Sequence, residues 1–454
     1  MTSYLKYKNI YFLGIGGVGM SGLAGWLNEH NFHISGYDKK KSLFTKQLKL
    51  KGIKIQHTTS LKSLPSSFLD PHQTLIVYTP AIKKSHKLLS FFISHHFCII
   101  KRSDILNQVA RNYQVIAIAG THGKTTISVM LSNILNHAGY KPNAFFGGMS
   151  NNFGSNFLKN DGNFMIIEAD EYDRSFLKLS PLISIISSID NDHGDTYDSY
   201  DEMMDAYCSF IIKTVNYSSN NTSSGSVFMN NNVIKKILAY MNSNHFDVIK
   251  HTDLSKIIYK NVIKDLNFHI DWSNINVVSD HNIQNAVSAI FVARHIGISK
   301  NEIINSFSNY CGVKRRFEYH INTNKNILID DYAHHPVEIE TLIQSVHKLY
   351  PQKKIFFIFQ PHLFSRTRDL HDDFCRVLGL VDYLALLEIY PAREEPIEGV
   401  SSQNLIDKIE LKNKWLVDKN NIISILDTVS PNLIITAGAG NVNMLIPDIK
   451  SFLT

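Results

Sequence analysis

The chain has 454 residues, of which 44% are hydrophobic and 19% charged, and its formal net charge is +6 at pH 7. At about 150 residues per domain, this length predicts roughly three domains, and no apolar run approaches the roughly 18 residues that would span a bilayer. The charge is spread along the chain and suits anionic small-molecule substrates as well as nucleic acid. The four cysteines are scattered without paired spacing, which favours a reduced, cytoplasmic, globular protein. We expect neither nucleic acid nor a membrane as partner.

The first predicted elements are a strand at 9–13, a glycine loop and an apolar helix through Leu27. The loop at 14–19 has the GxGxxG spacing that holds a diphosphate at a helix N-terminus. A second strand, at 32–37, ends at Asp38, where a carboxylate can hold a ribose or base edge. A dinucleotide cofactor is the default ligand of such a loop, but any nucleotide diphosphate fits it, so the motif alone is weak evidence for a dehydrogenase. Two more strands complete a small sheet, at 74–78 and 97–100.

The most informative motif is the run Ala-Gly-Thr-His-Gly-Lys-Thr-Thr at 119–126, between a buried strand at 113–119 and a helix at 127–135. The glycines let the backbone point several N–H groups at an anion, while Lys124 adds charge and Thr125 a hydroxyl for magnesium. The common phosphate loop has two more residues between its first glycine and the Gly-Lys pair. The alternative, a tight turn with an exposed lysine, is less favoured in this strand-loop-helix setting.

Carboxylates follow two later strands. The apolar strand beginning at Phe164 delivers Glu168, Asp170 and Glu171, and a strand at 182–189 leads into the polar run 190–195. Because parallel strands place their carboxyl ends at one edge of a sheet, we expect both runs near the phosphate loop. Magnesium favours a few oxygen ligands plus phosphate and water. A solvated strand end for Glu168 and a capping role for a histidine are the alternatives for single residues.

The remaining chain alternates further between loops, strands and helices. An Asn- and Ser-rich stretch at 215–232 is predicted to be a surface loop around a short strand. A helix is predicted to start near residue 280, where side-chain amides could hydrogen-bond an adenine edge, although by spacing alone an ordinary helix cap is favoured. Three adjacent cations at 314–316 suggest phosphate neutralisation at a domain boundary. A third α/β sheet is predicted from strands at 327–329, 354–359, 383–387 and 432–437. Its strand ends carry polar clusters, in which His334 and Glu338 lack a third metal ligand, so we favour substrate contact or capping.

Together these motifs resemble the Mur ligases over essentially the whole chain. The carriers are the glycine loop at 14–22, the phosphate loop at 120–126, and the runs 168–171, 192–193, 281–285, 314–318 and 331–336. The resemblance implies an α/β protein with the three-domain Mur ligase architecture. Its parts would be an N-terminal Rossmann-like UDP-sugar-binding domain at 1–107, a central P-loop ATP-binding domain at 108–318, and a C-terminal Rossmann-like amino-acid-binding domain at 319–454.

The resemblance also implies an activity in peptidoglycan precursor synthesis. A carboxylate is a poor electrophile, so the muramoyl carboxylate of UDP-N-acetylmuramate would attack the γ-phosphate of ATP and become an acyl phosphate. The amine of L-alanine would then displace phosphate. The cofactors would be ATP and Mg²⁺, the substrates small molecules, and the protein a monomer or weak homodimer in the cytoplasm. Domain closure would align the reactants and exclude water.

The family's roles carry over to the following residues. The catalytic and metal-binding groups would be Lys124, Thr125, Glu168 and His193. ATP would be bound by Gly120, Thr121, His122, Gly123, Lys124, Thr125, Thr126, His281, Asn282, Asn285, Arg315 and Arg316. The UDP-sugar would be bound by Gly14, Gly16, Gly17, Val18, Gly19 and Asp38, and the amino acid by His334, His335, His362 and Arg366.

Three positions depart from the family pattern: Leu363 replaces a common basic residue, Gly194 a large apolar residue, and Asn441 an aspartate. The nearest rival is the recycling ligase that attaches a tripeptide to the same UDP-sugar, although the sequence at 14–22 argues against it. Folylpolyglutamate synthase lacks the N-terminal glycine-loop domain. A nicotinamide-dependent oxidoreductase would use the first loop and ignore the second.

Overall fold

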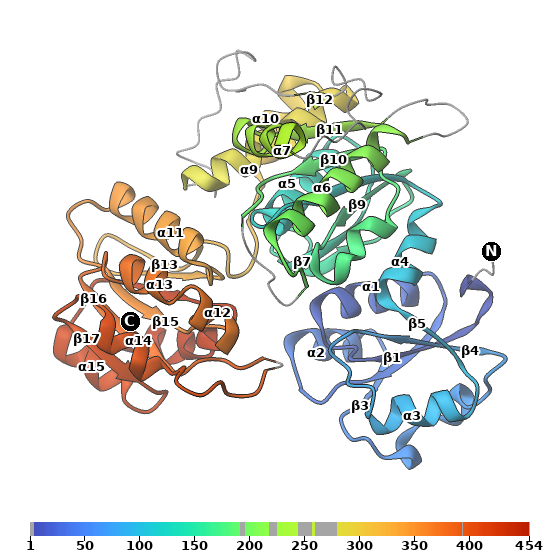
Figure 1. Cartoon of the computed structure of the whole chain (residues 1–454), viewed down its shortest axis with the longest axis horizontal. Coiled ribbons are helices and arrows are strands. Elements are labelled where there is room, and N and C mark those ends of the chain that lie inside the picture. Colours follow the sequence, from blue (N-terminus) through green and yellow to red (C-terminus); the bar gives the residue numbers. More distant parts are fainter. Residues whose placement is uncertain are drawn as a thin grey trace. The chain divides into compact units, whose positions relative to one another are not determined.

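The computed structural model describes residues 4–190, 196–217, 225–243, 257–258, 279–392 and 394–453. These residues form two compact units, one comprising Met1–Val278 with Asn282–Gly312, the other Ser279–His281 with Val313–Thr454. Three sheets are distributed over the units, two in the first and one in the second (Figure 1). The predicted α/β class is confirmed.

The first sheet has the order β3-β2-β1-β4-β5, and all of its strands are parallel. Its central strand, β1 (Asn9–Leu13), is buried along nearly its whole length because helices cover both faces of such a sheet. The short edge strand β3 was not predicted, since three half-exposed residues carry little hydrophobic pattern. The other strands are β2 (His33–Tyr37), β3 (Lys54–Gln56), β4 (Thr74–Tyr78) and β5 (Cys98–Lys101), and the helices are α1 (Val18–Glu29), α2 (Leu43–Leu50), α3 (Lys87–Ser94) and α4 (Arg102–Ala110).

The second sheet has seven strands in the order β12-β11-β10-β6-β9-β7-β8, with β7 and β8 antiparallel and the other pairs parallel. The β7–β8 hairpin was not predicted. It lies at one end of the sheet, whereas the apolar runs that predict strands most clearly belong to the central strands. The strands are β6 (Gln114–Ala119), β7 (Asn143–Ser150), β8 (Ser155–Leu158), β9 (Phe164–Glu168), β10 (Ile183–Ile186), β11 (Ser226–Met229) and β12 (Ile257–Ile258). The helices are α5 (Lys124–His137), α6 (Tyr200–Val215), α7 (Asn231–Ser243), α9 (Asp280–Ile296) and α10 (Lys300–Ser308).

Helix α1 joins the first sheet to the β7–β8 hairpin of the second. Asn156 donates hydrogen bonds to the Val18 carbonyl at 2.7 Å and to the Ser21 hydroxyl at 2.9 Å. The buried Trp26 indole donates to the Asn143 side chain at 3.0 Å. These buried polar groups are thus hydrogen-bonded within a hydrophobic contact. The buried side chains of both sheets belong to one continuous hydrophobic core. The predicted domain limit at 107 falls within α4, and the limits themselves remain predictions.

The second unit contains a six-stranded sheet in the order β13-β14-β18-β15-β16-β17, parallel except for β13. The edge strands β13 and β17 were not predicted, and the four inner strands were. Its strands are β13 (Glu318–Asn322), β14 (Ile327–Asp331), β15 (Phe356–Phe359), β16 (Tyr383–Leu387), β17 (Lys414–Val417) and β18 (Leu433–Ala437). The helices are α11 (Pro336–Leu349), α12 (Phe364–Asp369), α13 (His371–Leu378), α14 (Ser402–Lys408), α15 (Ile422–Val429) and α16 (Ile446–Leu453).

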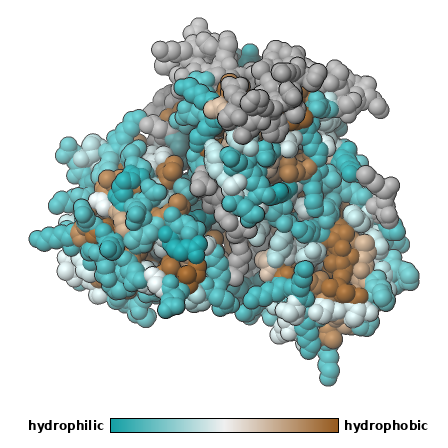
Figure 2. Space-filling view, in the orientation of Figure 1, coloured by the Kyte–Doolittle hydropathy of each residue, from teal (hydrophilic) through white to brown (hydrophobic). Residues whose placement is uncertain are grey.

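On the face drawn in Figure 2, hydrophilic side chains predominate and hydrophobic ones gather in small groups. Within the described ranges, no helix has both the length and the apolar character needed to cross a membrane.

Candidate active site

The phosphate loop follows β6 and ends where α5 begins at Lys124, as predicted. Two of its glycines have positive φ, +121° at Gly120 and +83° at Gly123, a region that other residues adopt only with strain. A Cβ at Gly120 would lie 2.4 Å from the Ser187 hydroxyl, and one at Gly123 would lie 2.4 Å from Oδ1 of Asn285. The loop therefore requires glycine at both positions for its conformation and for its close packing.

Lys124 lies under the loop and faces a buried carboxylate. Its Nζ donates to the Gly120 carbonyl at 2.6 Å and to both oxygens of Glu171 at 2.9 Å. The Lys124 side chain is 13% exposed and that of Glu171 0%. Burial disfavours the ammonium, but nearby carboxylates, chiefly Glu171, outweigh it and raise the pKa of Lys124 above its ordinary value. The lysine is therefore a fixed positive charge at the loop.

Thr125 and Glu168, the two predicted magnesium ligands from described residues, lie in hydrogen-bond contact. The Thr125 hydroxyl lies 2.9 and 3.0 Å from the two carboxylate oxygens of Glu168, and the Gly147 N–H also donates to this carboxylate. One hydroxyl and one carboxylate at a phosphate loop suit Mg²⁺, which completes its shell with phosphate and water. The third expected ligand, His193, lies outside the described residues, as do Asp192 and Gly194.

The segment after β10 fastens the phosphate loop. This strand ends at Ile186, earlier than predicted, because the following residues turn to bond the loop: the Thr121 N–H donates to the Ser188 carbonyl at 3.1 Å, and the His122 N–H to the Ser188 hydroxyl at 2.8 Å. The Asp190 N–H donates to the Thr121 hydroxyl at 2.8 Å. The loop is thus held by backbone and hydroxyl groups.

His122 and Asp190 add a contact between side chains to this segment. His122 Nε2 lies 3.3 Å from Asp190 Oδ2, and Lys236 Nζ lies 2.9 Å from Oδ1. The hydrogen bond from His122, helped by Lys236 and opposed by burial, holds the pKa of Asp190 well below its ordinary value. Asp190 is therefore an anchor for the loop in its ionised form.

The predicted adenine-binding residues are divided between the two units. Asn282 and Asn285 belong to the first unit, where Asn285 touches Gly123 and donates to the Asn282 side chain at 3.4 Å. His281 and the two arginines belong to the second unit. The Arg315 guanidinium binds Asp330 at 3.2 Å and the Gly440 carbonyl at 3.0 Å. Arg315 thus holds its own unit together in this structure.

The first glycine loop joins β1 to α1 and is closed by Asp38. The Gly16 N–H donates to Asp38 Oδ2 at 2.8 Å, and the Lys40 N–H donates to Oδ1 at 2.9 Å. Helix α1 begins after Gly17, with no side-chain cap and no acidic residue in its first turn. The predicted loop is present, and Asp38 shapes it from the end of the neighbouring strand.

Three of the four predicted amino-acid-binding residues gather at strand ends of the second unit. The rings of His334 and His362 have centroids 6.0 Å apart, and His362 also stacks on Tyr390 at 5.7 Å. Arg366 Nη1 lies 3.4 Å from His362 Nδ1. The fourth, His335, is buried as the N-cap of α11, where the Glu338 side chain completes a capping box.

Leu363 precedes α12 within this group and is buried with a φ of +73°. This backbone conformation strains a branched side chain, and such strain concentrates at ligand-binding turns. Beneath the group, Asp331 accepts N–H bonds from Phe317 and Ala333, each at 2.7 Å. Burial raises the pKa of Asp331 to about 6, against the opposing charge of Arg316.

Sequence reasoning missed two charged residues at these loops. Glu171 was named as part of a carboxylate run but was given no role, and Arg102 was not considered. Arg102 is the first residue of α4 and directly follows β5. The signal that points to it is its place at the carboxyl end of a parallel strand, where ligands bind in open α/β sheets.

Comparison with protein families places the whole chain in one group. The Mur ligase family catalytic domain matches residues 9–114, the Mur ligase middle domain residues 118–293, and the Mur ligase, glutamate ligase domain residues 315–440. The UDP-N-acetylmuramate–L-alanine ligase of Cytophaga hutchinsonii is 39% identical over 456 residues, covering 97% of this chain and 96% of that protein.

Two solved structures share the fold. The UDP-N-acetylmuramate-alanine ligase of Thermotoga maritima has a TM-score of 0.77 at 22% identity and covers 98% of this chain and 99% of its own. A murein peptide ligase of Psychrobacter arcticus has a TM-score of 0.68, also at 22% identity, and covers 98% of each chain. The three-domain architecture of these ligases is therefore confirmed as the fold.

Proposed function

The chain belongs to the Mur ligase family, and we propose that it joins L-alanine to UDP-N-acetylmuramate at the expense of ATP. One observation carries the proposal: the phosphate loop presents Lys124 against Glu171 and Thr125 against Glu168, in a chain that aligns over nearly its full length with ligases of that name. Such a loop supplies the charges that phosphoryl transfer needs.

The reaction has two steps. The muramoyl carboxylate attacks the γ-phosphorus of ATP, the bond to ADP breaks, and an acyl phosphate forms. The L-alanine nitrogen then attacks the acyl carbon, phosphate leaves with the bonding electrons, and the nitrogen loses a proton. A bound Mg²⁺ would neutralise the charge that develops on the phosphate oxygens.

The residues of the chain position the reactants. Lys124 exchanges its contact with Glu171 for the β- and γ-phosphates, because both are anionic partners within reach of the same ammonium. Thr125 and Glu168 would hold a bound Mg²⁺, with His193 as a further proposed ligand. Asn282 and Asn285 are the proposed contacts for the adenine end, together with His281 and with Arg315 or Arg316.

The amino acid binds at the second unit. His334, His335, His362 and Arg366 are the proposed contacts, and Arg366 meets the carboxylate of L-alanine. The buried N-cap position of His335 supports an indirect part, in which it shapes the turn that carries His334. We also propose a cytoplasmic location and a monomer or weak homodimer, since the substrates are intracellular precursors.

A phosphate-release assay tests the proposal. The full chain is supplied with ATP, Mg²⁺ and UDP-N-acetylmuramate, and with L-alanine, glycine, L-serine or the tripeptide in parallel. We expect the highest kcat/KM with L-alanine. Release with the tripeptide alone would assign the chain to the peptide-recycling ligases, and an absence of release with every acceptor would refute the ligase proposal.

A further inference from the structure

Arg102 lies against the first glycine loop, although the two are far apart in the sequence. A Cβ built on Gly19 would be 2.6 Å from Arg102 Nη1 and 3.0 Å from Cζ. The guanidinium therefore rests on the backbone of the first turn of α1, in the space that the missing side chain of Gly19 leaves open. The guanidinium of Arg102, from α4, thus packs against the last glycine of the GxGxxG loop.

Two ion pairs hold the helix that carries Arg102. Lys101 Nζ lies 2.9 Å from Asp173, and Lys178 pairs with Asp104. Arg102 stands between these paired residues, and within the described part of the chain its own guanidinium makes no hydrogen bond or ion pair. The backbone of Arg102 is therefore fixed while its charge is left available.

The electrostatics of this arrangement favour an anion. The N-terminus of α1 carries partial positive charge, and this helix has neither a side-chain cap nor an acidic residue in its first turn. A guanidinium placed on the same turn adds a second positive charge. Two positive groups placed together attract an anion more strongly than either does alone.

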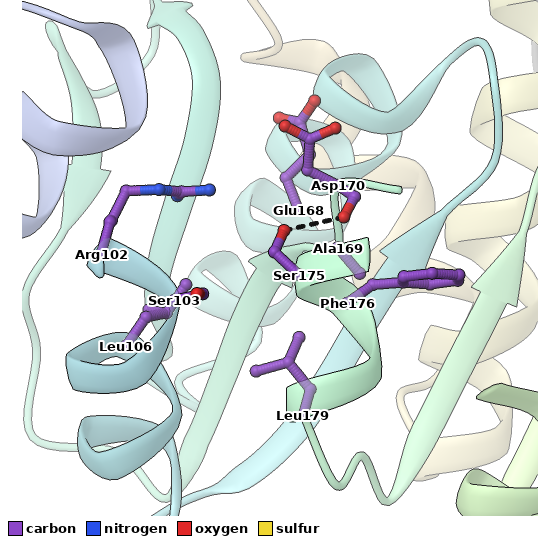
Figure 3. A pocket seen from close by; sticks show the side chains of 9 residues that line it. All are labelled: Arg102, Ser103, Leu106, Glu168, Ala169, Asp170, Ser175, Phe176 and Leu179. Atoms are coloured by element: carbon purple, nitrogen blue, oxygen red, sulfur yellow. Dashed lines mark hydrogen bonds between the residues drawn. The ribbon is translucent and has the colours of Figure 1, made fainter. Parts of the chain in front are cut away.

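A pocket beside Arg102 leads toward the metal-binding carboxylate. Its lining includes Arg102 and Ser103 of α4, and Glu168, Asp170 and Phe176 of the central sheet and its following segment. Figure 3 shows the Arg102 side chain extending from α4 into the space between that helix and the segment with Glu168 and Asp170. Arg102 thus lies between the first glycine loop and the proposed site of phosphoryl transfer.

We propose that Arg102 binds the diphosphate of the UDP-sugar and thereby positions the sugar toward the ATP site. The inference rests on the proposed function and adds to it a residue for substrate binding. The diphosphate is preferred to the muramoyl carboxylate because the guanidinium lies on Gly19, within the loop that receives the diphosphate. Arginine suits this task because its planar fork donates two hydrogen bonds to one phosphate group.

The test compares nucleotide affinities by isothermal titration calorimetry on the full chain. The ligands are UDP, UDP-N-acetylmuramate and UDP-N-acetylglucosamine, which lacks the lactyl carboxylate. We expect Arg102→Gln to raise the Kd of all three by about tenfold or more, with Arg102→Lys in between, because a charge-assisted contact is lost. An unchanged Kd for UDP would overturn the inference, as would weakening confined to UDP-N-acetylmuramate.

Arg111, at the other end of α4 and exposed, provides a charge-matched control. Arg111→Gln removes the same charge and should leave the Kd of UDP unchanged, and both variants should keep the wild-type Kd for ATP. An equal loss of UDP affinity in both variants would show a general charge effect and overturn the inference. A wild-type chain that binds no uridine nucleotide would refute the proposed function itself.

Gly19→Ala gives an independent test that keeps the arginine. Alanine is favourable in a helix, and its Cβ would occupy the seat of the guanidinium. We expect Gly19→Ala to weaken UDP binding in the wild-type background and to add nothing in Arg102→Gln. Additive losses would mean that Gly19 acts without Arg102 and would contradict the seat that we assign to it.

Discussion

The two glycine loops of the first unit follow the same strand-loop-helix plan but differ in the origin of their charges. The loop at 120–125 carries its own cation, Lys124, and its own hydroxyl, Thr125, and each faces a carboxylate within 3 Å. The loop at 14–19 carries no charged side chain. Its carboxylate, Asp38, and its cation, Arg102, come from other strand ends.

Under the proposed function, one backbone motif serves two ligands. Magnesium-bound triphosphate requires cations and oxygen ligands at fixed positions, so they are built into the second loop itself. A diphosphate that only needs to be held can be bound by backbone N–H groups and a single cation from a neighbouring element. We therefore expect changes in the second loop to affect turnover and changes in the first to affect affinity.

The largest expected effect is that of Lys124→Ala. Phosphate release should fall by at least about 10³-fold, because the charge on the transferred phosphate loses its partner, while the Kd of UDP-N-acetylmuramate stays unchanged. The variant should also lose roughly 3 kcal/mol of unfolding free energy, because Glu171 is left as an unpaired buried carboxylate. Adding Glu171→Gln should restore most of this stability without restoring turnover. Loss of UDP-sugar binding would contradict the separation of the two loops.

The next effect concerns the metal ligand. Glu168→Gln keeps the shape of the side chain and its contact with Thr125 but removes the charge. We expect kcat to fall on the order of 10²-fold and the Mg²⁺ concentration for half-maximal activity to rise, as measured by titration with Mg²⁺ at saturating ATP. An unchanged Mg²⁺ requirement would leave Glu168 only its structural contacts with the Thr125 hydroxyl and the Gly147 N–H.

A smaller effect is expected from the carboxylate of the first loop. Asp38→Ala removes the acceptor of the Gly16 N–H and should raise the Kd of UDP about tenfold, the cost of a hydrogen bond to a charged group. Asp38→Asn retains an acceptor and should have a smaller effect. The Kd of ATP should stay unchanged in both variants. A change in it would show that the two glycine loops are energetically coupled and would contradict their separate roles.

The smallest effect is a change of pH dependence at the second loop. The pKa of Asp190 is depressed in the folded chain, so its contribution to stability is present above the carboxyl group's ordinary pKa and is lost as the pH falls through the depressed value. His122→Gln should move the acid limit of ATP binding to higher pH. The acid limit of UDP binding serves as the internal control, and equal shifts of both would contradict a local role for the pair.

The sequence was most informative where one segment contains the whole signal. Both glycine loops lie between an apolar strand and a helix, so their position and type were predicted, as were the inner strands of the first and third sheets and those of the second sheet except β7. The pairing of Thr125 with Glu168 was also predictable, because β6 and β9 are neighbouring parallel strands whose ends share one edge. The edge strands β3, β8, β13 and β17 were missed, since they are short or half-exposed and carry little periodicity.

By itself, the sequence determined the α/β class, the two glycine loops and the family, because strand burial, glycine spacing and charged loop residues are local properties. The tertiary structure decided which charges meet. Glu171 faces Lys124, Asn285 packs on Gly123, and Arg102 rests on Gly19, and each contact depends on strand order and helix packing. No spacing along the chain encodes these pairings, because they arise only when separate strand ends are brought to the same edge of a sheet.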